Sequence, residues 1–265
     1  MSEAEPAVFD DTIGSPELSS PESYWEISRQ PLASLVFIAP LLLVYEVGVL
    51  LPVGASARNG VDVWLRTLLD WIGFGEYFLL PVLTVCILLG WHYTTRRPWR
   101  VSRRVLGRMA IESLVLAICL RAILEVQSAF LRGLLATGGS ETLLAVEQAG
   151  ASPAISERLG NLIMFLGAGI YEELLFRLIL LSALIVLLCR VGMTRKMGTI
   201  YAVALSSLLF AVAHHVGPHG EAFLLQPFLF RFVAGVFFCL LFLIRGFGIA
   251  AGTHAGYDIL VGLLP

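Results

Sequence analysis

The sequence has few charged residues for its length. Of 265 residues, only 14% are Asp, Glu, Lys or Arg, whereas soluble domains average about one quarter. Apolar residues make up 57% of the chain, and the mean hydropathy is +0.83. These values argue against a soluble enzyme and predict an integral membrane protein. No basic patch is interleaved with aromatic residues, so we expect no nucleic-acid partner.

Cysteine is also scarce, and the four cysteines are far apart. Each lies inside or at the end of an apolar run, and no Cys-x-x-Cys spacing occurs. The pattern therefore predicts neither a zinc knuckle nor a redox pair. We interpret them as small apolar packing residues: Cys86, Cys119, Cys189 and Cys239.

The signatures of several large enzyme classes are missing. The chain has no His-Glu-x-x-His and no Gly-x-Ser-x-Gly motif, no phosphate-binding glycine loop and no dinucleotide fingerprint. It also shows no internal repeat. The absence of an inverted repeat argues against a small transporter, although mildly.

What the sequence does contain is a series of apolar runs. A membrane-crossing helix needs about 20 residues, so we predict an all-α, polytopic transmembrane helical bundle with about seven spans, in a range of six to eight. The fourth run would be about 45 Å long as one helix, which predicts either one tilted helix or two pieces. The runs cover about residues 31–53, 77–93, 109–131, 159–189, 199–213, 222–244 and 247–264.

The distribution of charge predicts two regions and an orientation. Residues 1–30 contain seven acidic residues and one basic residue, with Ser and Pro, which predicts an acidic, disordered N-terminal tail. Residues 31–265 would form the multi-spanning membrane domain. Basic segments at 96–108, 190–196 and Arg245 fall on one side of a seven-span bundle, so the positive-inside rule places them and the N-terminus in the cytoplasm. The short loops favour a bacterial inner or plasma membrane.

Ionisable residues inside apolar runs are the candidates for function. A charge at membrane depth is costly, so such residues pair, face a cavity or take part in chemistry. Glu173 and Arg177 are four residues apart, which predicts an ion pair on one helix face. Glu172 then lacks a cation, and a desolvated carboxylate suits a general base. The alternative is a polar network that only joins helices.

Two further groups contain histidine. His214 and His215 point in different directions on a helix, so at most one is expected to meet Glu172, and we select His214 because it lies on the packed side. His254 and Asp258 share a helix face, and Asp258 can accept the N–H of His254 and fix its tautomer. Hydrogen bonds between helices are again the alternative.

Together the three groups resemble the ordered motifs of the CPBP family. This is the CAAX protease and bacteriocin-processing family of intramembrane endopeptidases, which includes the type II CAAX prenyl proteases. The resemblance covers about residues 155–262, and three motifs in order are far more specific than any one of them. The motifs are Glu172-Glu173-xxx-Arg177, Phe210-xxx-His214 and His254-xxx-Asp258.

The resemblance implies an intramembrane endopeptidase that acts on a peptide or protein substrate at the lipid bilayer. It also implies an enzyme of the glutamate type with no cofactor. Glu172 would be the base that activates water, assisted by His214, and Glu173 and Arg177 would support the site.

The resemblance assigns His254 and the residue at position 258 to the oxyanion of the tetrahedral intermediate. Family members often carry Asn at that position, and an ionised Asp258 cannot donate a hydrogen bond. Asp258 must therefore be protonated, orient His254 or bind a cation. Leu178 also departs from the glycine that is common after the arginine.

Two alternatives remain open from the residues. In the first, Glu172, His214 and His254 hold zinc with an open position, and Asp258 lies behind them, as in a metalloprotease. In the second, the protein is not an enzyme but a membrane scaffold, an immunity protein or a small transporter, because buried ionisable residues also serve ion pathways.

Overall fold

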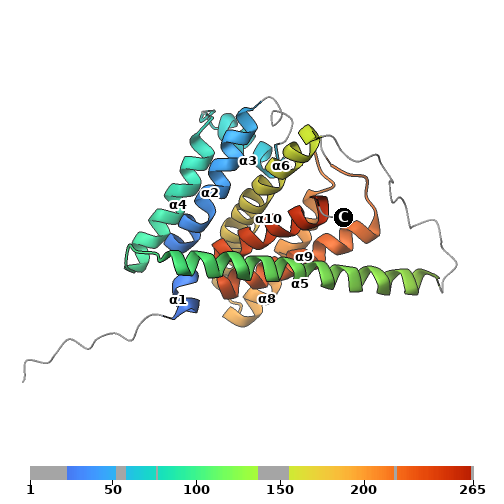
Figure 1. Ribbon diagram of the computed structural model, residues 1–265. Helices are drawn as coiled ribbons and strands as arrows, with labels where there is room; N and C mark the ends of the chain where they lie inside the picture. Colours follow the sequence, from blue (N-terminus) through green and yellow to red (C-terminus); the bar gives the residue numbers. More distant parts are fainter. Residues whose placement is uncertain (1–22, 52–57, 76, 137–154, 218–219, 264–265) are drawn as a thin grey trace, which may run out of the picture.

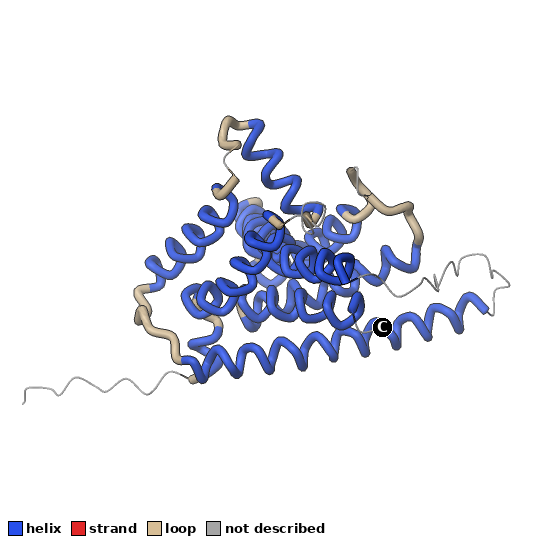
Figure 2. The backbone as a smooth tube through the Cα atoms, turned by 45° about the horizontal axis from the view of Figure 1, so that its top comes forward, coloured by secondary structure: helices blue, strands red, loops and turns tan. Residues whose placement is uncertain are grey.

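The computed structural model describes residues 23–51, 58–75, 77–136, 155–217 and 220–263. In this part of the chain every regular element is a helix, which confirms the predicted all-α bundle (Figures 1 and 2). The elements are α1 (Tyr24–Ser28), α2 (Pro31–Leu50), α3 (Gly60–Trp71), α4 (Leu79–Thr95), α5 (Arg103–Ala136), α6 (Ile155–Glu173), the π-helical segment η2 (Leu174–Leu181), α7 (Ser182–Arg190), α8 (Arg195–Ala213), α9 (Leu225–Arg245) and α10 (Phe247–Leu263).

Each predicted apolar run coincides with a helix or a helical series. The long fourth run is one uninterrupted series, because η2 follows α6 directly and α7 follows η2. Among the described helices, α2, α5, α8 and α9 are long and apolar enough to cross a membrane, and α4 is a shorter apolar helix. A multi-pass membrane protein is thus supported, while the count of seven spans stays a prediction.

The end of the predicted acidic tail is helical. Residues 1–22 lie outside the described residues, but α1 begins at Tyr24. The guanidinium of Arg245 lies 3.7 Å from the ring centroid of Trp25, and Arg245 also pairs with Glu112 of α5. These contacts hold α1 against the bundle, so the order in the chain starts before residue 30.

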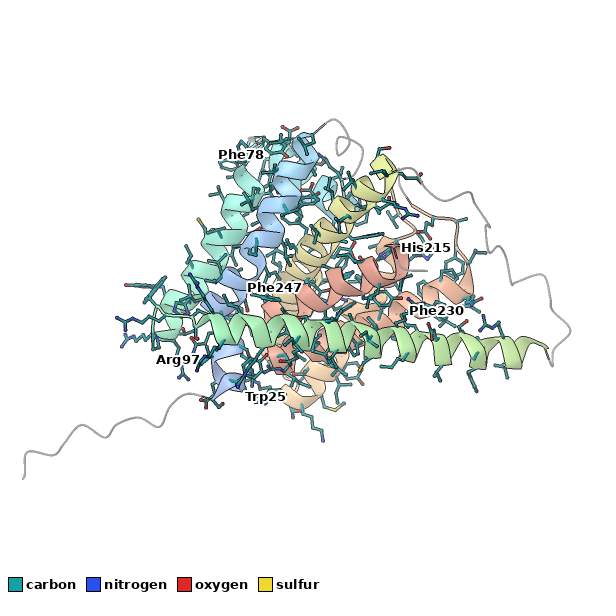
Figure 3. The ribbon with its side chains drawn as sticks, in the orientation of Figure 1. Trp25, Phe78, Arg97, His215, Phe230 and Phe247 are labelled. Atoms are coloured by element: carbon teal, nitrogen blue, oxygen red, sulfur yellow. The ribbon has the colours of Figure 1, made fainter. Side chains whose placement is uncertain are left out.

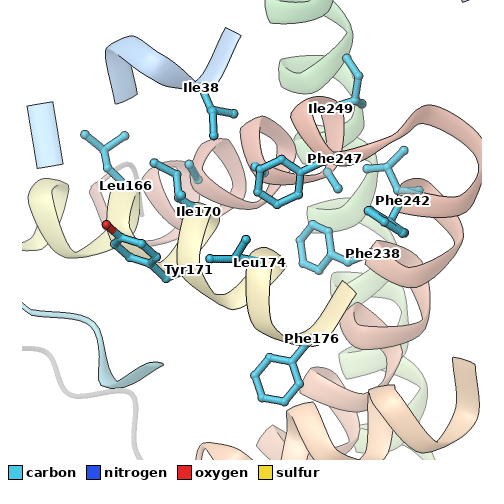
Figure 4. Packing of buried hydrophobic residues seen from close by; sticks show 14 of the residues in the cluster. Ile38, Leu166, Ile170, Tyr171, Leu174, Phe176, Phe238, Phe242, Phe247 and Ile249 are labelled. Carbon is cyan, nitrogen blue, oxygen red and sulfur yellow. The ribbon is translucent and has the colours of Figure 1, made fainter. Parts of the chain in front are cut away.

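Helix α10 lies at the centre of the packing. It packs most extensively against α5 and α6 and also contacts α2 and α9. Figure 4 shows Phe247 of α10 between Ile170 of α6 and Phe238 of α9, with Ile38 of α2 above them in the view. Burial of these side chains from four helices places the face of α10 that carries His254 inside the bundle.

A polar network fixes the short helix α3 against α2. Asp62 is fully buried and accepts hydrogen bonds from the Tyr45 hydroxyl at 2.7 Å and from Arg58 at 2.9 Å. Arg66 donates to Asp62 at 2.6 Å and to both oxygens of Glu46 at 3.1 Å. Because buried charges need partners, this α3 polar network sets where the N-terminus of α3 lies.

We expect Asp62→Ala to lower the free energy of unfolding by roughly 3 kcal/mol, because it removes the fully buried centre of the network and leaves the half-buried Arg66 guanidinium with fewer partners. The change is measured by denaturant or thermal unfolding of the purified protein in detergent. Thr67→Ala is the matched control, because Thr67 is exposed on the same helix and its hydroxyl bonds only to the Val63 carbonyl. Equal effects of the two variants would contradict this role.

Candidate active site

The six predicted site residues come from three separate parts of the chain and meet in the fold. The first group lies at the end of α6 and in η2. The second group is a histidine that directly follows α8, and the third group, a histidine and an aspartate, lies in α10. Close contacts link all six residues: Glu172, Glu173, Arg177, His214, His254 and Asp258.

A close approach of α6 to α10 brings the first and third groups together. A Cβ atom on Gly169 would lie 2.7 Å from the Ala255 backbone nitrogen and 2.8 Å from the Ala251 carbonyl oxygen. Only glycine allows this backbone contact. Since Glu173 is one helical turn after Gly169 and His254 precedes Ala255, the contact brings the carboxylate to the imidazole.

The helix changes its hydrogen-bond register directly after the two carboxylates. Glu173 is the last residue of α6, and the π-helical segment η2 begins at Leu174 and contains Arg177. Such segments are rare and are frequent at functional sites.

The Glu173 carboxylate joins two of the groups. It is fully buried, and its Oε1 lies 3.0 Å from Nη1 of Arg177, which confirms the predicted ion pair. The same oxygen lies 2.7 Å from Nδ1 of His254. A carboxylate oxygen only accepts, so Nδ1 carries the hydrogen and Nε2 of His254 faces the cavity side. Glu173 thus orients both basic side chains.

This geometry corrects the role that the sequence assigned to Asp258. Its Oδ2 lies 3.6 Å from Nε2 of His254, which is beyond hydrogen-bond reach. The acceptor that fixes the tautomer of His254 is Glu173. The helical spacing of four residues correctly placed Asp258 near His254, but a tertiary contact from α6 has the better geometry.

Arg177 is buried among aromatic rings. Its guanidinium carbon lies 4.2 Å from the ring centroid of Phe210 and 5.3 Å from that of Phe238. The faces of aromatic rings attract a cation, and the ion pair with Glu173 offsets the desolvation of both charges. Phe210 of the second motif therefore packs on Arg177 of the first motif.

The two oxygens of Glu172 have different surroundings. Oε1 accepts a hydrogen bond of 2.8 Å from Nδ2 of Asn59, which precedes α3. Oε2 accepts no hydrogen bond from the residues that the structure describes. It lies 3.8 Å from Nε2 of His254 and 4.0 Å from Nε2 of His214.

The two neighbouring histidines after α8 point in different directions, as predicted. Nδ1 of His214 donates to the Phe210 carbonyl at 2.8 Å, which leaves Nε2 directed at Glu172. His215 instead lies 3.1 Å from the Glu221 carbonyl and packs on nearby aromatic rings. In Figure 3, His215 lies on the opposite side of the view from Arg97, the labelled arginine of the segment between α4 and α5. The selection of His214 as the neighbour of Glu172 is confirmed.

Two cavities open onto these groups. One has a volume of about 390 Å³ and is lined by Glu172 and Asn59 together with His214 and Asp258. The other has a volume of about 280 Å³ and is lined by His214, His254 and Asp258, with apolar residues of α9 around them. The site therefore borders spaces that can admit a segment of a peptide.

A charged pair lies at the edge of these cavities. Arg231 donates to a carboxylate oxygen of Glu221 at 2.7 Å, and this hydrogen bond holds the pKa of Glu221 below its ordinary value. Glu221 lines the larger cavity and Arg231 the smaller one.

Within the described residues, no group of three or more His, Cys, Asp or Glu side chains is arranged to hold a metal ion. The zinc alternative would use Oε2 of Glu172, which lies 3.8 Å from Nε2 of His254 and 4.0 Å from Nε2 of His214.

The sequence did not indicate Asn59 as a site residue. A helix N-cap could have been recognised from Asn-Gly before the polar and apolar alternation of residues 60–71. Its hydrogen bond to Glu172, however, joins positions 113 residues apart, and no local pattern reports such a contact.

Comparison with known proteins gives one match. Residues 155–260 match the family model described as type II CAAX prenyl endopeptidase Rce1-like. This segment is therefore similar to that family, in agreement with the resemblance drawn from the three motifs. It starts with α6 and contains all six predicted site residues, but it excludes Asn59. No curated protein and no solved structure matches the chain.

We expect Gly169→Ala to destabilise the protein by about 1–3 kcal/mol, because the added methyl group must push α6 away from the α10 backbone. Gly90→Ala is the control, since a Cβ at that position in α4 meets no atom within 4 Å. The control should be neutral or slightly stabilising, because alanine favours the helix. Unfolding midpoints in detergent measure both, and a neutral Gly169→Ala would contradict the close contact.

Proposed function

We propose that the protein is an intramembrane endopeptidase that hydrolyses peptide bonds of membrane-associated substrates, using water activated by Glu172 and His214. The match of residues 155–260 to a prenyl endopeptidase family supports protease activity. The observation that carries the glutamate mechanism is that Oε2 of Glu172 faces the Nε2 atoms of both histidines beside a cavity.

The first step is the attack of water on the scissile carbonyl. Oε2 of Glu172 and Nε2 of His214 are 4.0 Å apart, so one water molecule can donate a hydrogen bond to each. Glu172 takes a proton as the water oxygen bonds to the carbonyl carbon. The protonated carboxyl then gives that proton to the amide nitrogen as the C–N bond breaks.

The second requirement is stabilisation of the oxyanion. His254 lies close to Glu172 and Glu173, whose carboxylates would compensate the charge of a protonated ring. Its Nε2–H could then donate to the developing negative oxygen. Asp258 lines both cavities, and its carboxyl would contribute a donor in the protonated form.

Glu173 and Arg177 act on the site through other residues. The Glu173 carboxylate holds Nδ1 of His254, and Arg177 holds Glu173 while it packs on Phe210. The carbonyl of Phe210 in turn holds His214. Both imidazoles are therefore held by groups behind them, which preorganises them for the reaction.

We also propose a plasma-membrane location with the arginine-rich end in the cytoplasm. The segment between α4 and α5 exposes Arg97, Trp99 and Arg100, and the exposed Trp91 lies near the end of α4. Arginines and interfacial tryptophans together are typical of the cytoplasmic boundary of a bilayer. Arg97 and Trp25 lie toward the same end of the molecule in Figure 3.

The first test uses variants of the purified protein with a prenylated CAAX peptide. Glu172→Gln and His214→Ala should each lower kcat by roughly 10²–10⁴-fold, because each removes a group that takes part in proton transfer. His215→Ala is the matched control and should keep activity close to that of the unchanged protein, because His215 faces Glu221. Undiminished cleavage by Glu172→Gln would overturn the role of Glu172 as the base, whereas undetectable cleavage by the unchanged protein on every substrate would favour a scaffold or immunity protein.

The second test distinguishes the glutamate mechanism from the zinc alternative. We expect the protein to keep its peptidase activity after dialysis against a chelator, with no bound metal detected by elemental analysis. The described site offers no group of three metal ligands. Loss of activity on chelation, followed by recovery with zinc, would instead establish the metalloprotease.

A further inference from the structure

We infer that Asn59 is a positioning residue for Glu172: it holds Oε1 and so makes Oε2 the oxygen that accepts the proton from water. The inference rests on the proposed function and adds to it a residue from the first half of the chain. Asn59 lies outside the segment that matches the family.

The orientation of the Asn59 amide follows from its two partners. The backbone N–H of Val61 lies 2.8 Å from Oδ1 of Asn59, and only an oxygen can accept it. The other end of the amide lies 2.8 Å from Oε1 of Glu172, and only an NH₂ group can donate there. The two contacts are mutually consistent, so a flipped amide would break both hydrogen bonds.

This hydrogen bond distinguishes two oxygens that are otherwise equivalent. The last torsion of a glutamate side chain is soft, so an unrestrained carboxylate samples many orientations. With Oε1 held by Asn59, Oε2 points toward the Nε2 atoms of His214 and His254. One oxygen is therefore used for anchoring, and the other is left with free lone pairs on the reaction side.

The chemical type of the anchor also matters. Asn59 is neutral, so it restrains the Glu172 carboxylate without adding the positive charge that would weaken it as a base. The neighbouring Glu173 has the opposite arrangement, because it is paired with Arg177. This contrast fits a base at position 172 and a supporting anion at position 173.

The fold holds Asn59 in place from both directions. Both side chains of the pair are buried, with 8% of Asn59 and 5% of Glu172 exposed. Asn59 is the N-cap of α3, and Asp62, at the centre of the α3 polar network, lies in the first turn of that helix. The anchor is therefore part of a rigid element.

The experiment separates the cap from the anchor. Asn59→Ser and Asn59→Asp both keep an oxygen that can accept the Val61 N–H, because both residues are good N-caps, but neither keeps the amide donor. We expect kcat on a prenylated CAAX peptide to fall by about 10- to 100-fold, since the base loses its orientation. KM and the unfolding midpoint should change little for Asn59→Ser, whereas Asn59→Asp also places a second carboxyl group beside Glu172 and should lower the midpoint.

Two further variants provide the comparison. Thr194→Ala removes the side-chain cap of α8, where Thr194 accepts from Met197 N, and should lower the unfolding midpoint while leaving kcat unchanged. Asn59→Ala removes both functions of Asn59 and should lower both quantities. A merely structural Asn59 would instead lower kcat only in proportion to the folded fraction.

The outcomes distinguish this inference from the proposed function. If Asn59→Ser and Asn59→Asp keep the kcat of the unchanged protein while Glu172→Gln is inactive, Asn59 has no positioning role and the proposed function stands. If Glu172→Gln itself keeps full activity, the base is elsewhere and both statements fail. A selective loss of kcat in Asn59→Ser, with normal KM and stability, supports the inference.

Discussion

The arrangement of the site depends on one oxygen, Oε1 of Glu173, which is shared by Arg177 and His254. All three side chains are buried, and a buried charge is tolerated only when its partners are in place. The oxygen therefore ties the π-helical segment to α10. Loss of Arg177 would leave the Glu173 carboxylate without its cation in the core, so the ion pair is under strong physical constraint.

The same constraint explains how two adjacent carboxylates can serve different purposes. On a helix, consecutive side chains diverge by about 100°, so Glu172 faces the larger cavity while Glu173 faces the protein interior. One is paired with a guanidinium and the other with a neutral amide. Under the proposed mechanism, their surroundings, and not their chemical type, make one a supporting anion and the other a base.

Much of this site could be predicted because its members are ionisable residues in apolar runs. The four-residue spacing gave the Glu173–Arg177 pair, and helix geometry separated His214 from His215. Tertiary contacts were beyond reach, since nothing local tells Glu173 from Asp258 as the partner of His254. Composition likewise cannot separate helices that face lipid from those that face protein, so the helices were predictable but the number of spans was not.

The two cavities share His214 and Asp258 but are bordered by different helices, one by α3 and α6 and the other by α5 and α9. A polypeptide lying across the reactive groups would have one flank in each compartment. Under the proposed function, the two halves of a cleaved chain would not need to leave by a common exit. Departure of one fragment would then be independent of the other, and a bulky lipid attached to one half would not block the way out for its counterpart.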